Sequence, residues 1–252
     1  MLLAIDIGNT NIKSALFDGD NIAGYKIHSD RADFLNYINK LSFDEVAVSS
    51  VNKAFEEDIV GTISKNSVPV FKAGIQNKFS FIIDYETPET LGIDRLCSAS
   101  GAFSIALKNQ LLSSNQYLVT IDFGTATTIN IVSPDKKFLG GLISPGIKTM
   151  LKVLNEKTAQ LPLVNQDSYK GIIGKSTNSS ILSGVITATI GMIKETINYL
   201  EKNSGVQPII FATGGNARYI LPYLDPKIIF DEALVLKGLQ KVYELNTPID
   251  VS

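Results

Sequence analysis

Residues 2–12, LLAIDIGNTNI, decide the fold. The apolar run Leu2–Ile5 is typical of a buried strand, which ends at Asp6 before the chain turns at Gly8. A carboxylate at a strand end can hold a hydrated divalent cation, and a glycine lets main-chain N–H groups approach phosphate oxygens. A lone D-x-G-N-T sequence is equally compatible with an ordinary hairpin turn.

The same pattern recurs at residues 118–130, LVTIDFGTATTIN. Asp122 and Gly124 repeat the spacing of Asp6 and Gly8 after a second buried run, and threonines replace the polar residues of the first copy. Each copy continues through a strand, a polar turn and another strand. We therefore expect two similar lobes whose D-x-G turns face each other across a cleft that holds a polyphosphate and its cation.

Helices and strands alternate after the first meander. Apolar spacing predicts helices over 32–41 and 54–64, and short apolar runs predict strands over 46–51 and 68–71. The first lobe therefore has the order β-β-β-α-β-α-β, and we predict an α/β protein with lobes at 1–113 and 114–252.

Further elements follow from the same periodicities. We expect a strand over 77–84 and a strand over 208–211, and helices over 93–108, 147–160, 176–202, 218–224 and 233–243. The glycine-rich segment 140–146 indicates a loop that comes close to the opposite lobe or to a substrate. The pair Gly214 and Gly215 can lay a nucleotide against main chain, although such pairs also form common tight turns.

Composition excludes several classes of protein. Charged residues are balanced, with 23 basic and 25 acidic side chains, which disfavours a polybasic nucleic-acid surface. One cysteine, Cys97, and one histidine, His28, leave neither an intrachain disulfide nor a Cys/His zinc cluster, so we expect both to be structural. The sequence starts on an apolar strand without a basic leader and lacks an uninterrupted apolar stretch of membrane-spanning length. We expect a cytoplasmic protein without nucleic-acid or membrane partners.

Residues 85–95, YETPETLGIDR, place a carboxylate and a guanidinium at a helix start. Pro88 favours a helical turn, and Gly92 allows close approach before the helix begins. The helix dipole favours ionised Asp94, and Arg95 can fork to a carboxylate or phosphate. The alternative is an ordinary solvated Asp-Arg pair, against which the preceding proline and glycine argue.

These motifs together resemble the type III pantothenate kinase family over nearly the whole chain. The matching segments are DIGNTN at 6–11, YxxPxxLGxDR at 85–95, DFGTAT at 122–127, GGxIxPG at 140–146 and TGG at 213–215. The D-x-G turns are shared with the wider acetate kinase, sugar kinase and actin superfamily, whereas the block at 85–95 is specific to the family. The resemblance implies two ribonuclease-H-like lobes of the actin-like ATPase architecture.

The resemblance also implies an activity and its residues. The activity is ATP-dependent phosphorylation of pantothenate to 4′-phosphopantothenate, the first step of coenzyme A synthesis. Asp94 is implied as the proton acceptor and Asp122 as a ligand of a monovalent cation, potassium or ammonium, beside magnesium bound with ATP. The implied pantothenate-binding residues are Tyr85, Gly92, Ile93, Asp94, Arg95 and Thr177. The implied ATP-binding residues are Asp6, Ile7, Gly8, Asn9, Thr10, Asn11, Ile12, Lys13 and Thr125.

One residue departs from the pattern, and two other functions stay open. Asn130 stands where family members commonly carry an aspartate, which puts the cation site in doubt. One rival function is a non-catalytic accessory factor for transcription on the same scaffold. The other is a different small-molecule kinase of the superfamily, such as a sugar kinase. Retention of Asp6, Asp94 and Asp122 argues against lost catalysis.

The long helix that starts near Ser176 carries small residues on a second face, which favours close approach of another helix. They are Ser183, Gly184, Thr187, Ala188 and Gly191. A core contact is the alternative, but we predict a homodimer built on this helix. By resemblance, Thr177 then reaches the pantothenate pocket of the other copy.

Overall fold

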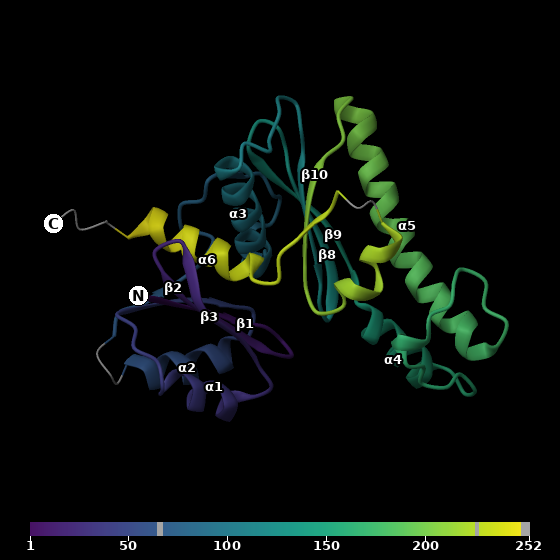
Figure 1. Cartoon of the computed structure of the whole chain (residues 1–252), viewed down its shortest axis with the longest axis horizontal. Coiled ribbons are helices and arrows are strands. Elements are labelled where there is room, and N and C mark those ends of the chain that lie inside the picture. The colour runs from purple at the N-terminus through teal and green to yellow at the C-terminus, as the bar shows by residue number, and fades with distance from the viewer. Residues whose placement is uncertain (65–67, 225–226, 248–252) are drawn as a thin grey trace. The chain divides into compact units, whose positions relative to one another are not determined.

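The computed structural model describes residues 1–64, 68–224 and 227–247 (Figure 1). The strands are β1 (Leu2–Ile7), β2 (Ile12–Asp18), β3 (Asn21–His28), β4 (Glu45–Ser50), β5 (Val70–Lys72), β6 (Ile82–Ile83), β7 (Leu118–Phe123), β8 (Ala126–Val132), β9 (Lys137–Pro145), β10 (Ile209–Thr213) and β11 (Ile229–Phe230). The α-helices are α1 (Arg31–Ile38), α2 (Lys53–Ser64), α3 (Ile93–Lys108), α4 (Ile147–Lys157), α5 (Thr177–Ser204) and α6 (Leu234–Asn246). The predicted α/β class is confirmed.

The two sheets repeat one strand order. Among the described residues they run β3-β2-β1-β4-β5 and β11-β10-β7-β8-β9-β6. In each, the strand that carries the D-x-G turn is antiparallel to the next strand and parallel to a later one. The parallel register places Asp6 opposite Ser49 and Asp122 opposite Thr213. This repeated order confirms the predicted duplication of ribonuclease-H-like lobes.

The chain divides into two compact units. The first contains Met1–Gln110, Lys136–Phe138 and the C-terminal residues from Ala233 onward, and the second contains Leu111–Asp135 and Leu139–Glu232. The boundary after Gln110 lies close to the predicted one after residue 113. The C-terminal helix α6, which the sequence prediction assigned to the second lobe, belongs to the first unit, because its apolar face packs on α3 and on β1.

In the first unit, β1 is buried on both faces. Its alternate residues Leu3, Ile5 and Ile7 join a core with side chains of α1 and α2, which lie together on that face of the sheet (Figure 1). The intervening positions of β1, Asp6 among them, face the other way, because successive strand side chains point to opposite faces. Helix α6 contacts β1, β2 and β4 there.

Two glycines bring α3 and α6 of the first unit into main-chain contact. A Cβ on Gly101 would lie 2.3 Å from the carbonyl oxygen of Leu234. A Cβ on Gly238 would lie 1.7 Å from the carbonyl oxygen of Cys97. Because no side chain fits at either position, this crossing fixes the position of α3 against α6, and with it the segment Gly92–Arg95 at the start of α3.

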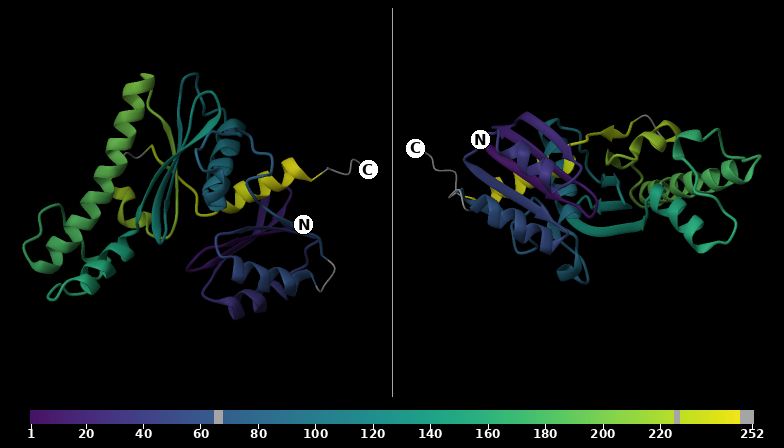
Figure 2. Two further views of the ribbon diagram at one scale, coloured as in Figure 1. Left: turned by 180° about the vertical axis from the view of Figure 1, so that it is seen from behind. Right: turned by 90° about the horizontal axis from the view of Figure 1, so that it is seen from below.

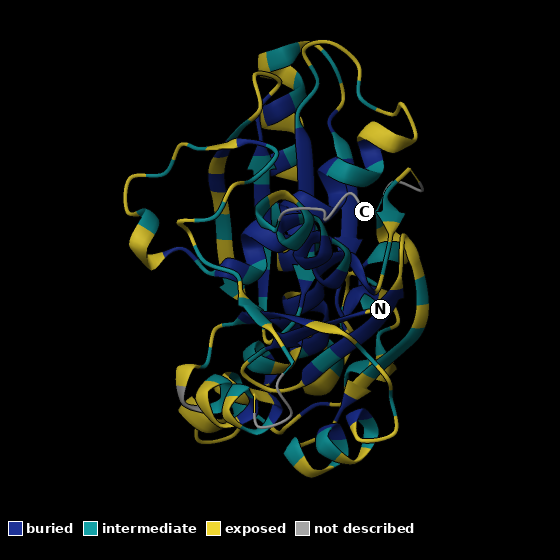
Figure 3. Cartoon of the chain, turned by 90° about the vertical axis from the view of Figure 1, so that its left-hand side faces the viewer, coloured by how far each residue is buried: buried dark blue, intermediate teal, exposed yellow. Residues whose placement is uncertain are grey.

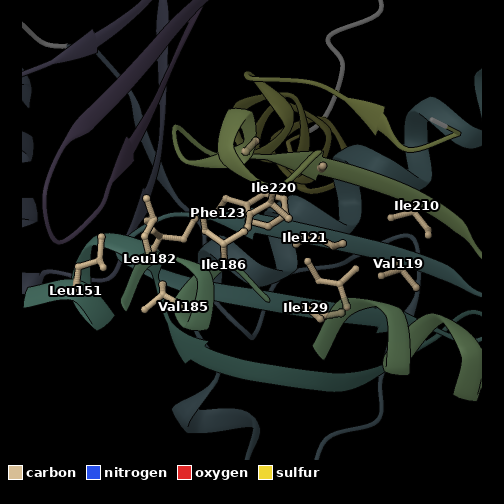
Figure 4. Close-up of a cluster of buried hydrophobic side chains, with 14 of the residues drawn as sticks. Val119, Ile121, Phe123, Ile129, Leu151, Leu182, Val185, Ile186, Ile210 and Ile220 are labelled. Atoms are coloured by element: carbon tan, nitrogen blue, oxygen red, sulfur yellow. The ribbon is translucent and has the colours of Figure 1, made fainter. Parts of the chain in front are cut away.

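The core of the second unit is formed between its sheet and α4 and α5. Phe123, Ile121 and Ile129 from the strands meet Leu182 and Ile186 from α5 (Figure 4). Figure 2 shows α5 running beside this sheet from two directions. Figure 3 shows the buried residues concentrated along the strands and the exposed ones on loops and outer helix faces. The core therefore holds β7, which carries the second D-x-G turn.

Helix α5 has defined ends and an apolar face. Ser176 and Ser179 form a capping box at its start, and Gly205, with φ of 73°, ends it in the left-handed conformation. By length and composition α5 could cross a membrane, and of the described helices it is the one that meets this criterion. Its residues Leu182, Ile186 and Ile193 are instead buried in the core of the second unit.

Two predicted elements were wrong in extent or type. The strand expected over 77–84 is limited to Ile82–Ile83, because the N–H groups of Asn77 and Lys78 bond to the Gly74 carbonyl and the Asn246 side chain rather than to a neighbouring strand. The helix expected over 218–224 consists of two short 3₁₀ turns, Ala217–Tyr219 and Leu221–Tyr223. Pro222 has no N–H to donate, so an α-helix cannot continue through it.

The glycine-rich segment 140–146, which was predicted to be a loop, forms the end of β9 and the residue before α4, and two of its glycines approach main chain of their own unit. Its approach to the opposite lobe or to a substrate stays a prediction. A Cβ on Gly141, whose φ is +145°, would lie 1.9 Å from the carbonyl oxygen of Ile129 on β8. A Cβ on Gly146 would lie 2.3 Å from the carbonyl oxygen of Gly124. The glycines therefore allow β9 and the start of α4 to pack tightly against β8 and the second D-x-G turn.

The single histidine is buried in the first unit. Its Nε2 lies 2.7 Å from the Ser14 hydroxyl, and its Nδ1 lies 3.5 Å from a carboxylate oxygen of Asp33. Burial lowers the pKa of His28, against the raising effect of the Asp33 charge. The ring also packs edge-on against Phe34. These contacts support the structural role that was predicted for it.

Replacement of Gly238 by alanine tests the α3–α6 crossing. The added methyl group overlaps the Cys97 carbonyl, so we expect Gly238→Ala to lower the free energy of unfolding by ~3 kcal/mol. Gly61→Ala is the matched control, because a Cβ on Gly61 in α2 would meet no described atom within 4 Å. That control should be neutral or stabilising by up to ~1 kcal/mol. Urea denaturation measures both, and equal effects would contradict the close crossing.

Candidate active site

The first candidate element is the turn after β1. Gly8 donates its N–H to the carbonyl oxygen of Asn11 at 3.1 Å, which closes the turn. Asn9 and Thr10 at its tip are exposed. Ile7 and Ile12 have side chains in the core, so only their main chain can contact a ligand. Lys13 is half-buried on β2 and pairs in register with Asp6. The remaining predicted contacts of this turn, Asn11 and Gly8, are exposed and half-buried respectively.

Asp6 lies in a small polar cluster within the first unit. Its carboxylate accepts a hydrogen bond of 3.1 Å from the Ser49 hydroxyl on β4. Burial raises the pKa of the Cys97 thiol well above its usual range, and the negative charges of Asp6 and Asp94 raise it further. The charges of two carboxylates from distant segments therefore both favour the neutral thiol form of Cys97.

Asp94 lies in the first turn of α3, where the helix dipole favours its negative charge. Its Oδ1 accepts a hydrogen bond of 2.9 Å from the Arg95 N–H. A Cβ on Gly92 would lie 2.5 Å from the same oxygen, so the glycine leaves the room that this carboxylate occupies. Ile93 is buried and offers only its main chain. Residues 85–95 thus place the Asp94 carboxylate at the start of α3, a helix whose position is fixed by its contact with α6.

Arg95 packs beside two aromatic rings and is 5% exposed. Its guanidinium carbon is 5.9 Å from the ring centroid of Tyr85 and 5.8 Å from that of Phe138. The two rings contact each other edge-on, with centroids 6.4 Å apart. Cation–π contacts of this kind hold a guanidinium in place at low exposure. The predicted partners Tyr85 and Arg95 are therefore brought together, and Phe138 is an addition that the sequence motif did not indicate.

The second D-x-G turn lies against the T-G-G segment in the second unit. Gly214, with φ of +97°, passes so close that a Cβ would lie 2.4 Å from Asp122 Oδ1. Only glycine combines this φ with this approach. Thr125 at the tip of the turn is exposed. The predicted nucleotide-binding residues Asp122, Thr125 and Gly214 are therefore neighbours.

Two functional candidates escaped the sequence analysis. Asn216 donates its side-chain N–H to the Gly124 carbonyl oxygen at 3.0 Å and its main-chain N–H to that of Phe123 at 3.1 Å. Ser49, described above, holds Asp6. Both follow from the strand order, since Ser49 lies on β4 and Asn216 lies three residues beyond β10, the two strands that pair in parallel with the D-x-G strands. The sequence signal that could have indicated them is a polar residue at or just beyond the end of each of those two strands.

One oxygen donor stands where the cation was predicted: Asp122 Oδ1, against which the main chain of Gly214 packs. A carboxylate oxygen is a ligand that suits a hard cation. Nowhere in residues 1–64, 68–224 and 227–247 do three His, Cys, Asp or Glu side chains cluster as metal ligands. A divalent ion would therefore take most of its ligands from nucleotide phosphates, as Mg²⁺ commonly does. Asn130 is buried, and its amide donates to Thr120 at 3.1 Å.

Thr177 is exposed at the first position of α5. A groove of about 460 Å³ lies nearby on the second unit, lined by Ile172, Ile173, Gly174, Ser180, Ser183, Gly184, Thr187 and Ala188. Ser183, one of the small residues predicted to face a partner helix, is instead buried within the second unit. Its hydroxyl donates to the Gly171 carbonyl at 2.7 Å. Gly184, Ala188 and Gly191 are exposed.

Comparison with known proteins identifies the family. A sequence profile of type III pantothenate kinase matches residues 2–199. The type III pantothenate kinase of Flavobacterium psychrophilum is 34% identical over 97% of this chain and 99% of its own length. That of Sulfurihydrogenibium sp. is 32% identical over 95% of this chain and 98% of its own. The match therefore includes every motif that carried the resemblance up to Thr177, and the relatives extend it through the T-G-G segment.

A solved structure shows the same fold. A protein from Campylobacter jejuni, described as a Baf family transcriptional activator, superimposes with a TM-score of 0.60. The alignment covers 96% of this chain and 97% of that one at 23% identity, which supports the fold alone. With a family profile over most of its length and relatives above 30% identity across nearly all of it, the chain belongs to the type III pantothenate kinase family.

Proposed function

We propose that this chain transfers the γ-phosphoryl group of ATP to pantothenate and forms 4′-phosphopantothenate, the first step of coenzyme A synthesis. Membership of the type III pantothenate kinase family supports this activity. One structural observation carries it: Ser49 on β4 donates to the Asp6 carboxylate at 3.1 Å, and α3, whose first turn holds Asp94, packs against β4 in the same unit. This packing supports a phosphate-binding turn and a proton acceptor on neighbouring elements.

In the proposed reaction, Asp94 accepts the proton of the pantothenate hydroxyl. The hydroxyl oxygen forms a bond to the γ-phosphorus while the bond from that phosphorus to the ADP oxygen breaks. Phosphoryl transfer asks mainly for alignment and charge neutralisation from the protein. Asp94 is suited to its role because the start of α3 holds its carboxylate, which is half-buried and occupies the space that Gly92 leaves. Arg95 and Tyr85 would bind pantothenate beside it.

The nucleotide would be bound through the two D-x-G turns. Residues 6–13 supply main-chain N–H groups and the side chains of Asn9, Thr10, Asn11 and Lys13, and Thr125 supplies a further contact. A magnesium ion bound with ATP and a potassium or ammonium ion at Asp122 would neutralise phosphate charge. We place the reaction in the cytoplasm, where ATP is available.

The working unit is proposed to be a homodimer built on α5. Exposed Gly184, Ala188 and Gly191 leave its outer face without bulk, so a second copy of the helix can approach closely. Thr177 at the start of α5 would then contact pantothenate bound to the partner copy.

A substrate panel tests the proposed activity. ATP consumption should depend on pantothenate and stay at background with glucose, mannose or N-acetylated hexosamines. Turnover of a sugar in place of pantothenate would identify a different kinase of the superfamily. Absence of ATP consumption with pantothenate and with every sugar would support the non-catalytic alternative.

Asp94→Asn tests the proton acceptor. The amide keeps the size of the side chain but cannot accept the proton, so kcat should fall by ~10² to 10⁴-fold. Circular dichroism should show an unchanged fold. Steady-state turnover is the readout, and a variant that works at near wild-type rate would end this assignment.

Asp6→Asn and Asp122→Asn test the nucleotide side. Each change removes a charge at the end of an equivalent strand, so the KM for ATP and the cation dependence should change more than the KM for pantothenate. Titration of each variant with both substrates and with potassium separates these effects. A change confined to pantothenate would contradict the assignment of both turns.

Ala188→Arg tests the dimer. A long charged side chain on the small-residue face should dissociate the dimer and lower pantothenate turnover together. Light scattering and activity are measured at the same protein concentration. Lys194→Arg, at an exposed position further along α5, is the control. A wild-type protein that is fully active as a monomer would refute both the interface and the shared site.

A further inference from the structure

The carbonyl oxygens of the second D-x-G turn are held by donors from outside the turn. Phe123 and Gly124 accept from Asn216, at 3.1 Å from its main chain and 3.0 Å from its side chain. Thr125 accepts from the Gly146 N–H at 2.8 Å and from the Thr149 hydroxyl at 2.7 Å. Three consecutive carbonyls are therefore fixed by two separate segments of the second unit.

Fixing a carbonyl also fixes the N–H of the next residue. No peptide bond between described residues is cis, so the oxygen and the following N–H of each peptide point in opposite directions. The bond from Asn216 to the Gly124 oxygen therefore sets the direction of the Thr125 N–H. A phosphate-binding turn needs this order, with its carbonyls turned away from the anion and its N–H groups toward it.

The held peptide begins at a glycine, which makes an external donor necessary. Gly124 lacks a Cβ and has the widest conformational freedom of any residue. Its own N–H bonds the Ala126 carbonyl at 3.0 Å, and this bond engages neither the carbonyl oxygen of Gly124 nor the N–H of Thr125. Asn216 is 8% exposed, so its bond to this peptide is largely shielded from competing water.

We propose that Asn216 is a positioning residue for the nucleotide, which aims the Gly124–Thr125 peptide at the phosphates of ATP. The inference rests on the proposed function, in which Thr125 contacts ATP. Thr149 serves the next peptide in the same way, through its hydroxyl. The internal repeat supports a dedicated role: Asn52 lies at the equivalent position beyond β4, the parallel partner of the first D-x-G strand, but its side chain accepts from the Phe55 N–H and caps α2.

The test compares Asn216→Ala and Asn216→Leu with the wild-type protein. Leucine keeps the branched shape of asparagine, but methyl groups replace the amide oxygen and nitrogen, so it has no donor. Both variants should raise the KM for ATP and the Kd for Mg·ADP by about tenfold, the worth of one lost hydrogen bond. The KM for pantothenate should stay within about twofold. A role in packing alone would spare the leucine variant, and a general loss of structure would affect both substrates equally.

Matched variants complete the design. Asn155→Ala removes a comparable amide, which donates to the Leu161 carbonyl at 2.8 Å in the same unit, and should leave nucleotide affinity unchanged. Thr149→Val alters a half-buried hydroxyl without changing size, so it tests the turn even where Asn216 variants do not fold.

Calorimetric titration with Mg·ADP separates two kinds of failure. A wild-type protein that binds the nucleotide but does not phosphorylate pantothenate would overturn the proposed function, whereas the positioning role would still be measured. Unchanged Mg·ADP affinity in Asn216→Leu and in Thr149→Val would overturn the positioning role.

Discussion

The contact on which the first unit depends is the crossing of α3 and α6 at Gly101 and Gly238. The helices touch through main chain, so neither can shift without a clash. Helix α3 carries Asp94 in its first turn, and Cys97, one turn further along the helix, is fully buried. A rigid helix is a better support for a proton acceptor than a loop, because transfer depends on sub-ångström placement.

The two units share one strand order, but the residues that it brings beside the D-x-G turn differ between them. In the first, the parallel neighbour of the D-x-G strand provides Ser49, whose hydroxyl holds the carboxylate itself. In the second, the equivalent neighbour continues into Gly214 and Asn216, which crowd the aspartate and hold the turn after it. Duplication thus supplied two scaffolds, and the residues that follow the paired strands distinguish them.

Sequence patterns predicted those helix and strand bounds that depend on residues close together in the chain. Helix α3 was predicted with its observed bounds, Ile93–Lys108, because Gly92 and a first-turn aspartate mark its start. The placement of α6 in the first unit could not be predicted, since periodicity shows that a helix has an apolar face but not which partner covers it. Asn216 was missed for a similar reason: its role depends on a parallel pairing between strands that are far apart in the chain.

The most direct test of the account is the identity of the product. The protein is incubated with pantothenate and ATP labelled in the γ-phosphate, and the product is analysed by mass spectrometry and phosphorus NMR. The account predicts one labelled phosphate, esterified to the primary hydroxyl of pantothenate, with ADP formed in equal amount. Release of labelled inorganic phosphate without a pantothenate ester would contradict it.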